Sequence, residues 1–116
     1  MTDARRHSWQ QAIDALEERI ALGHEELRFL AQLANRLNSA DIEVFAVAND
    51  DCLQLFADEN RSRTDAASIV IMPDRDLPYF HLLCPKGTDG VSETWWCEGE
   101  QEAVEAIKAL LPKLSA

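Results

Sequence analysis

The helical spacing of apolar residues across residues 8–38 constrains this chain more than any other feature. Apolar positions recur there at alternating steps of three and four, the period of an α-helix. They are Trp9, Ile13, Leu16, Ile20, Gly23, Leu27, Leu30, Ala34 and Leu37. The spacing predicts one continuous helix of about 45 Å, begun by a capping box of Ser8 and Gln11. Residues 1–7 are expected to form a flexible lead-in. Because a glycine inside a helix costs about 1 kcal/mol, a break at Gly23 into a helical hairpin is the alternative.

Beyond residue 41 the apolar pattern changes from helical to strand-like. Five short runs bounded by turn residues predict strands at 42–48, 52–57, 68–72, 79–84 and 91–97. Short connections favour antiparallel neighbours, and hence a five-stranded meander. An amphipathic helix is expected at 100–114. The predicted fold class is therefore α+β, in the order α-β5-α, with residues 1–116 forming a single domain.

The predicted sheet has apolar residues on both faces. In its first strand Ile42, Val44 and Ala46 alternate with Phe45 and Val47. An antiparallel sheet with one wet face would alternate apolar with polar residues, so both faces should be covered. Two helices cover one face and leave the other to a partner subunit or a ligand. Together with the long first helix, this predicts a homodimer. The expected interface along the helix consists of Ile13, Leu16, Ile20, Gly23 and Leu27.

The charge balance restricts the partners. The chain has 21 acidic and 11 basic residues, a formal net charge of -10. A negative charge opposes direct binding to nucleic acid or to an anionic membrane, and it permits a basic protein partner. In a meander the first and third turns lie at one end of the sheet. This places Asp50, Asp51, Asp74 and Asp76 in one acidic region, a candidate binding surface. The alternative explanation is a solvated turn region, since turns favour aspartate for backbone reasons.

The sequence contains no recognisable catalytic or metal-binding motif. No apolar run approaches the roughly 18–20 residues of a membrane span, and no signal-peptide core is apparent. The cysteines Cys52, Cys84 and Cys97 are scattered and odd in number, which favours reduced thiols and a cytoplasmic location. His81 and Cys84 lie three apart on a predicted strand and so face opposite ways. We therefore expect no metal, no cofactor and no enzymatic activity.

Trp95 and Trp96 form the densest aromatic point. Adjacent strand residues face opposite sides, so one indole should join the core and the other should lie on a mixed polar face. Trp96, with Tyr79 and His81 nearby, is a candidate for an interface or a shallow ligand pocket. The alternative is that a helix covers it.

These features predict a cytoplasmic, non-enzymatic and self-associating acidic protein-interaction module, of the bacterial accessory or inhibitor type. Two alternatives come from other classes. One is a small-molecule-binding module with a pocket between the sheet and the helices, near Trp96, Tyr79 and His81. The other is a nucleic-acid-mimicking inhibitor of a basic enzyme.

Overall fold

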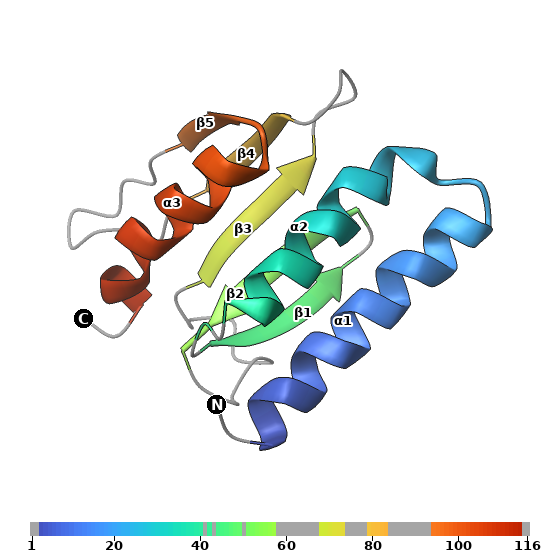
Figure 1. The fold of residues 1–116 in the computed structure, drawn as a ribbon, viewed down its shortest axis with the longest axis horizontal. Helices are drawn as coiled ribbons and strands as arrows, with labels where there is room; N and C mark the ends of the chain where they lie inside the picture. The colour runs from blue at the N-terminus through green and yellow to red at the C-terminus, as the bar shows by residue number, and fades with distance from the viewer. Residues whose placement is uncertain are drawn as a thin grey trace.

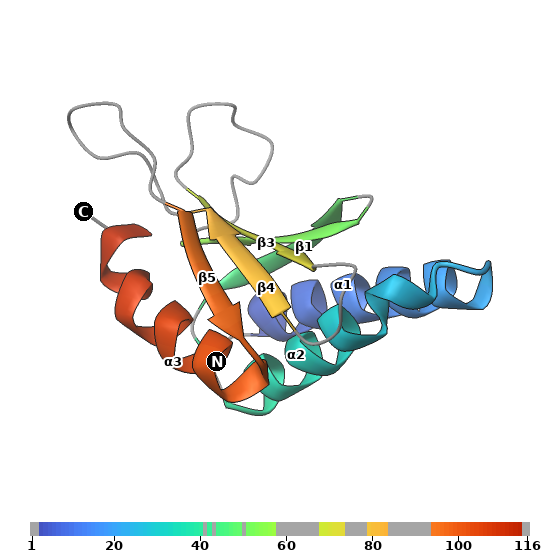
Figure 2. The same cartoon turned by 90° about the horizontal axis from the view of Figure 1, so that it is seen from above.

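The computed structural model describes residues 3–40, 42, 44–49, 51–57, 68–73, 79–83 and 94–114. In this part of the chain a five-stranded antiparallel sheet carries its α-helices on one face (Figures 1 and 2). The predicted α+β class, with helical structure before and after a five-stranded sheet, is confirmed. None of the described helices combines the length and the apolar character needed to cross a membrane.

The N-terminal helical region is a hairpin of two helices. Helix α1 covers Asp3–Ala21, the 3-10 helix η1 covers Glu25–Leu27, and α2 covers Arg28–Ser39. The two α-helices lie side by side in Figure 1. The prediction of one continuous helix through Gly23 is therefore wrong.

Gly23 ends α1 because its backbone takes a conformation that a helix interior does not contain. Its φ angle is +111°, in the region that favours glycine. The N–H of Gly23 bonds to the carbonyl of Ile20 at 3.0 Å, and the N–H of His24 bonds to that of Arg19 at 3.0 Å. These two bonds are those of a Schellman motif, which satisfies the last carbonyls of a helix. Gly23, whose position also fits the apolar spacing of a continuous helix, therefore terminates α1.

The start of α1 also differs from the prediction. The helix begins at Asp3, so residues 3–7 are helical and Ser8 lies inside the helix. The Ser8 hydroxyl donates to the carbonyl of Arg5 at 2.7 Å and accepts from the backbone N–H of Ala46 at 3.1 Å. The expected capping box is therefore absent, because the hydroxyl bonds to a strand far along the sequence.

The strands follow one another in order across the sheet. They are β1 (Phe45–Asn49), β2 (Cys52–Phe56), β3 (Ser68–Pro73), β4 (Tyr79–Leu83) and β5 (Thr94–Glu98), each antiparallel to the next. The predicted meander is confirmed. Helix α3 (Glu100–Leu110) then continues into the 3-10 helix η2 (Leu111–Leu114). Pro112 lies in η2, just beyond the end of regular α-helical bonding, where the missing N–H of a proline is tolerated.

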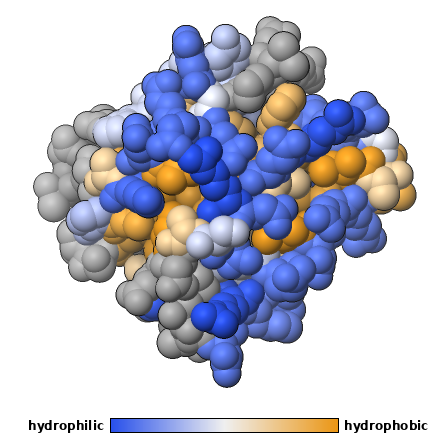
Figure 3. All heavy atoms as spheres, in the orientation of Figure 1, coloured by the Kyte–Doolittle hydropathy of each residue, from blue (hydrophilic) through white to orange (hydrophobic). Residues whose placement is uncertain are grey.

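One continuous core fills the space between the sheet and the helices. Helix α1 packs along β1, α2 packs across β2 and β3, and α3 packs against β5. The helix-facing side chains of the sheet include Leu53, Leu55, Ile69, Ile71, Phe80, Leu82 and Cys97, all buried. Seen from the helix side, the surface is mostly hydrophilic, with apolar residues showing only in bands (Figure 3). The apolar stripes of the helices are therefore used largely within the chain.

Candidate functional site

The face of the sheet opposite the helices is the first component of the candidate site. No helix or strand within the described ranges lies over it (Figure 2). We call this surface the open face. The strand register places on it Phe45, Val47, Asn49, Cys52, Gln54, Phe56, Ser68, Val70, Met72, Tyr79, His81, Leu83, Thr94 and Trp96. Phe45 and Phe56, which pair with each other at one end of this face, are buried. Its side chains are mainly apolar or neutral. Two charged groups lie at its ends: Glu98 at the end of β5, and the guanidinium of Arg5 of α1, 5.5 Å from the centroid of the Phe45 ring.

An aromatic cluster occupies the β4–β5 side of the open face. His81 and Trp96 are directly paired across the two strands, with ring centroids 4.1 Å apart and an edge-to-face arrangement. Tyr79 stacks on Trp96 with centroids 5.7 Å apart. Trp96 nevertheless remains 47% exposed. Because these contacts restrain the ring before any partner arrives, the indole is a pre-ordered contact surface.

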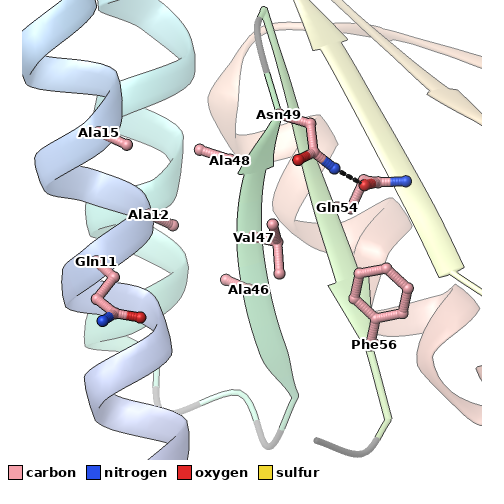
Figure 4. A pocket seen from close by; sticks show the side chains of 9 residues that line it. All are labelled: Gln11, Ala12, Ala15, Ala46, Val47, Ala48, Asn49, Gln54 and Phe56. Carbon is pink, nitrogen blue, oxygen red and sulfur yellow. Dashed lines mark hydrogen bonds between the residues drawn. The ribbon is translucent and has the colours of Figure 1, made fainter. Parts of the chain in front are cut away.

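A groove lies at the opposite edge of the open face, between α1 and β1. Its volume is about 410 Å³. In Figure 4, Ala46 and Ala48 point toward α1, which presents Ala12, Ala15 and Gln11 along the groove. The open-face residues complete the lining: Val47, Asn49, Gln54 and Phe56. The side-chain amide of Asn49 donates to that of Gln54, so two polar groups of the wall are fixed relative to each other.

Two side chains of α1 hold the helix against β1 and thereby form the groove. Ser8 accepts the hydrogen bond from the N–H of Ala46, and the indole Nε1 of Trp9 donates to the carbonyl of Val44 at 2.9 Å. Ser8 is only 1% exposed and is the one buried polar side chain among the described residues. Farther along α1, the small side chains of Ala12 and Ala15 leave the space that becomes the groove.

The structure brings together three residues selected from the sequence. Tyr79, His81 and Trp96 form one cluster, but they lie on the face away from the helices. A pocket between the sheet and the helices, as expected for the small-molecule alternative, therefore does not contain them. The reason is that the described helices α1, α2 and α3 pack on the other face (Figure 2).

The predicted acidic region falls largely outside the described residues. Asp50, Asp74 and Asp76 are not described, and Asp51 is an exposed turn residue between β1 and β2. The region stays a prediction. Cys84 also lies outside the described residues, whereas Cys52 is half-buried on β2 and Cys97 is buried on β5.

Most of the residues expected to form a dimer interface along the first helix lie in the core of the chain and not on its surface. Ile13, Leu16 and Leu27 are buried inside the chain, where they belong to its own core. Ile20 packs partly against that core, and Gly23 lies in the turn after α1. The apolar stripe is thus satisfied by α2 and the sheet, so self-association stays a prediction that needs another surface.

The groove and the bonds that build it were missed at the sequence level. The one usable signal was the pair Ala12 and Ala15, small residues one helical turn apart on α1. The alternation of Phe45 and Val47 with Ala46 had indicated a second apolar face but not its edge. Ser8 and Trp9 gave no signal of their contacts, because Val44 and Ala46 lie more than thirty positions away.

Comparisons of the chain with protein-family models, with curated proteins and with solved structures find no match. Within the described ranges, no three His, Cys, Asp or Glu side chains are grouped so as to hold a metal ion. The functional argument therefore rests on the geometry of the open face, its aromatic cluster and the groove.

Proposed function

We propose that this chain is a non-enzymatic protein-interaction module that self-associates through the open face of its sheet. The observation that carries the proposal is the exposure of Trp96 within an apolar sheet face that no described helix or strand covers. Trp and Tyr are enriched at protein interfaces, where a few such residues supply most of the binding energy.

The chemistry of the open face supports a neutral, apolar protein surface as its partner. One row of paired residues runs across all five strands and consists of Val47, Gln54, Val70, Leu83 and Thr94. The next row on this face ends in Trp96. None of the five residues from Val47 to Thr94 in the first row is acidic or basic. A second copy of the chain offers the same neutral row of side chains.

The two described cysteines allow a direct test. Cys52 lies on the open face, and Cys97 lies in the core on the other face. On self-association, the labelling rate of Cys52 by a maleimide should fall as chain concentration rises through the micromolar range. Peptide mass mapping would follow Cys52 and Cys97 separately, with Cys97 slow throughout as the internal reference.

The mass in solution must change in parallel. Light scattering should report twice the 13.1 kDa of one chain where Cys52 becomes protected. A mass of one chain across the whole range would refute self-association. A doubled mass with no protection of Cys52 would place the interface on another surface.

Two further parts of the proposal rest on narrower observations. The odd number of scattered cysteines, Cys52, Cys84 and Cys97, supports a reducing compartment such as the cytoplasm. As a second candidate function, the groove supports binding of an uncharged small molecule, since its volume of about 410 Å³ is within the range of ligand sites, roughly 300–1,000 Å³. Native mass spectrometry of the protein purified from its host would test it: a bound compound lost on filling the groove by Ala15→Leu supports it, and ligand-free protein contradicts it.

A further inference from the structure

We infer that the groove between α1 and β1 receives an extended, uncharged peptide segment of a partner protein, which pairs with Ala48 as an added strand. The inference deepens the second candidate function, on which it rests, because it names the class of uncharged ligand that the groove takes. Its starting point is the outer edge of β1. There α1 satisfies the backbone of Val44 and Ala46, and the groove follows along the same edge.

The backbone of Ala48 has a donor and an acceptor that face the groove. Ala46 donates its N–H to Ser8 on α1, so the backbone groups of Ala46 point away from β2. Ala48 lies two residues further along the same regular register, so its N–H and C=O also point away from β2. Among the described residues, no hydrogen bond on this outer side of Ala48 is found. A neighbouring strand would supply the partner of each group.

The groove leaves room for such a strand beside Ala48. Ala48 lies in the wall of the groove and is half-buried, whereas Ala46 is buried next to α1. Helix α1 and strand β1 run in the same direction, and the side chain of Ala48 points toward the part of α1 that carries Ala12 and Ala15 (Figures 1 and 4). Because these two side chains are small, the helix does not fill the space beside the strand.

The pairing geometry defines the middle residue of the segment. In an antiparallel pair, one residue opposite Ala48 exchanges two hydrogen bonds with it. The side chains of such a pair point to the same face, so the side chain of this residue follows that of Ala48 toward Ala12 and Ala15. Methyl groups line that space, and an aliphatic side chain suits it. The residues before and after it point to the open face, beside Asn49 and Val47.

The groove has one closed end, which limits the length of the segment. At the N-terminal end of β1, Phe56 lines the groove and pairs with the buried Phe45. The guanidinium of Arg5 lies 5.5 Å from the centroid of the Phe45 ring. From Ala46 to Asn49 the strand rises roughly 10 Å, at about 3.3 Å per residue, which about three extended residues cover. The contact therefore consists of a short segment.

The polarity of the groove favours a segment from the interior of a chain. None of the described residues that line the groove is charged, and its polar side chains are the carboxamides of Gln11, Asn49 and Gln54. A chain terminus would bring a charge that finds no partner there, at a cost in free energy. An internal segment has neutral peptide groups on both sides of its middle residue. Strand addition of this kind takes its affinity from main-chain bonds and its specificity from alternate side chains.

The first experiment tests the direction of the Ala48 N–H without a ligand. Proline lacks this N–H and is tolerated on an edge strand where the N–H faces outward. Ala48→Pro should therefore lower the urea midpoint less than Val47→Pro, which removes a bond between β1 and β2. In the parent protein, amide hydrogen exchange should be faster at Ala48 than at Val47. Equal midpoints together with equal exchange would place the Ala48 N–H inside the sheet and overturn the inference.

The second experiment measures binding of a blocked peptide, acetyl-Ser-Val-Ser-amide, by NMR. Titration in the millimolar range should shift the amide resonance of Ala48 and slow its hydrogen exchange. The matched control is the same peptide with a methyl group on the valine nitrogen, which removes the donor to the Ala48 carbonyl. It should bind about tenfold more weakly, the effect of one lost hydrogen bond.

Protein variants test the position of the peptide. Ala15→Leu fills the groove and should raise the dissociation constant about tenfold, whereas Ala109→Leu, on the exposed side of α3, should leave it unchanged. Ala48→Pro removes the backbone donor and should weaken binding by a similar factor. Unchanged urea midpoints of the two leucine variants show that both are folded.

The outcomes separate the inference from the second candidate function. Equal binding of the methylated peptide, with loss on Ala15→Leu, overturns strand pairing and leaves the groove as a ligand site. Peptide binding that tolerates Ala15→Leu, together with ligand-free protein from the host, overturns both. An Ala48 resonance that does not shift overturns the inference. Slower exchange at Ala48 on raising the protein concentration, with no peptide present, would make a second copy the occupant and also overturns it.

Discussion

The hydroxyl of Ser8 on α1 accepts a hydrogen bond of 3.1 Å from the backbone N–H of Ala46 on β1. Neighbouring residues of an antiparallel strand direct their backbone groups alternately to either side, so this N–H points away from β2. Trp9 donates to the carbonyl of Val44 on the same outer edge. Unpaired groups on an edge strand are a template for aggregation. Two side chains of a helix thus take the place of a neighbouring strand along part of that edge.

Replacing Ser8 by alanine should lower the free energy of unfolding by about 1–3 kcal/mol, because the buried N–H of Ala46 loses its acceptor. Urea denaturation of both proteins measures the difference. Ser39→Ala, at an exposed position near the end of α2, is the matched control and should change stability by less than about 0.5 kcal/mol. Equal effects of the two substitutions would mean that the bond contributes nothing.

Trp9 gives a second, independent test of the same edge. Trp9→Phe keeps an aromatic ring in the core but leaves the carbonyl of Val44 without the indole donor. We expect a loss of about 1–3 kcal/mol in the free energy of unfolding. The control is Trp96→Phe, an exposed indole on the open face, measured at concentrations where the chain is monomeric. If Trp96→Phe costs as much as Trp9→Phe, the bond to Val44 is not the source of the loss.

The sign of the Gly23→Ala effect reports whether α1 ends at that residue. At a φ of +111° a side chain is strained, although no atom lies within 4 Å of the position a Cβ would take. Gly23→Ala should therefore destabilise the fold by about 1 kcal/mol, a purely conformational effect. In a continuous helix the same change would stabilise by about 1 kcal/mol. A thermal melt of the two proteins distinguishes these opposite directions.

Leu82 and Leu83 are neighbours on β4 that face opposite sides of the sheet. Leu82 is fully buried under the helices, whereas Leu83 is half-buried on the open face. Leu82→Ala should cost about 2–5 kcal/mol, since it leaves a cavity in the core. Leu83→Ala should cost the monomer no more than about 1 kcal/mol, because a half-buried side chain already contacts water and its removal leaves no enclosed cavity. Similar losses in urea denaturation would show that the open face is as well covered as the core.

The sign of the salt effect identifies the partner's charge. Each copy carries a formal charge of -10, so two copies repel one another. Raising the salt from about 10 to about 150 mM shortens the screening length from about 30 to about 8 Å, and the dimer should become tighter. Binding to a basic protein would weaken under the same change. Sedimentation at both salt concentrations measures the direction, with Leu22→Ser as a control that retains the charge.

The sequence by itself determined the features that depend on local spacing. The two-residue period placed Trp95 and Trp96 on opposite faces, and the structure confirms that Trp95 packs against the core while Trp96 remains exposed. The same period identified all five strands and the meander, since short connections leave few other arrangements. Tyr79 and His81 could be associated with Trp96 for this reason, because adjacent antiparallel strands bring them into register.

Only the tertiary structure decided what covers each apolar surface. The spacing of Ile13, Leu16 and Leu27 requires that something cover them, but it is the same whether the cover is a second chain or α2 of this one. Gly23 is compatible with a close helical contact and with a chain reversal. In the folded chain it forms the reversal, because α2 can then return over the sheet. Ser8 has the signature of a helix cap, yet its acceptor role depends on Ala46, which folding alone brings near. Local spacing specifies which side of an element is apolar, whereas the partner of that side is set by the packing of the whole chain.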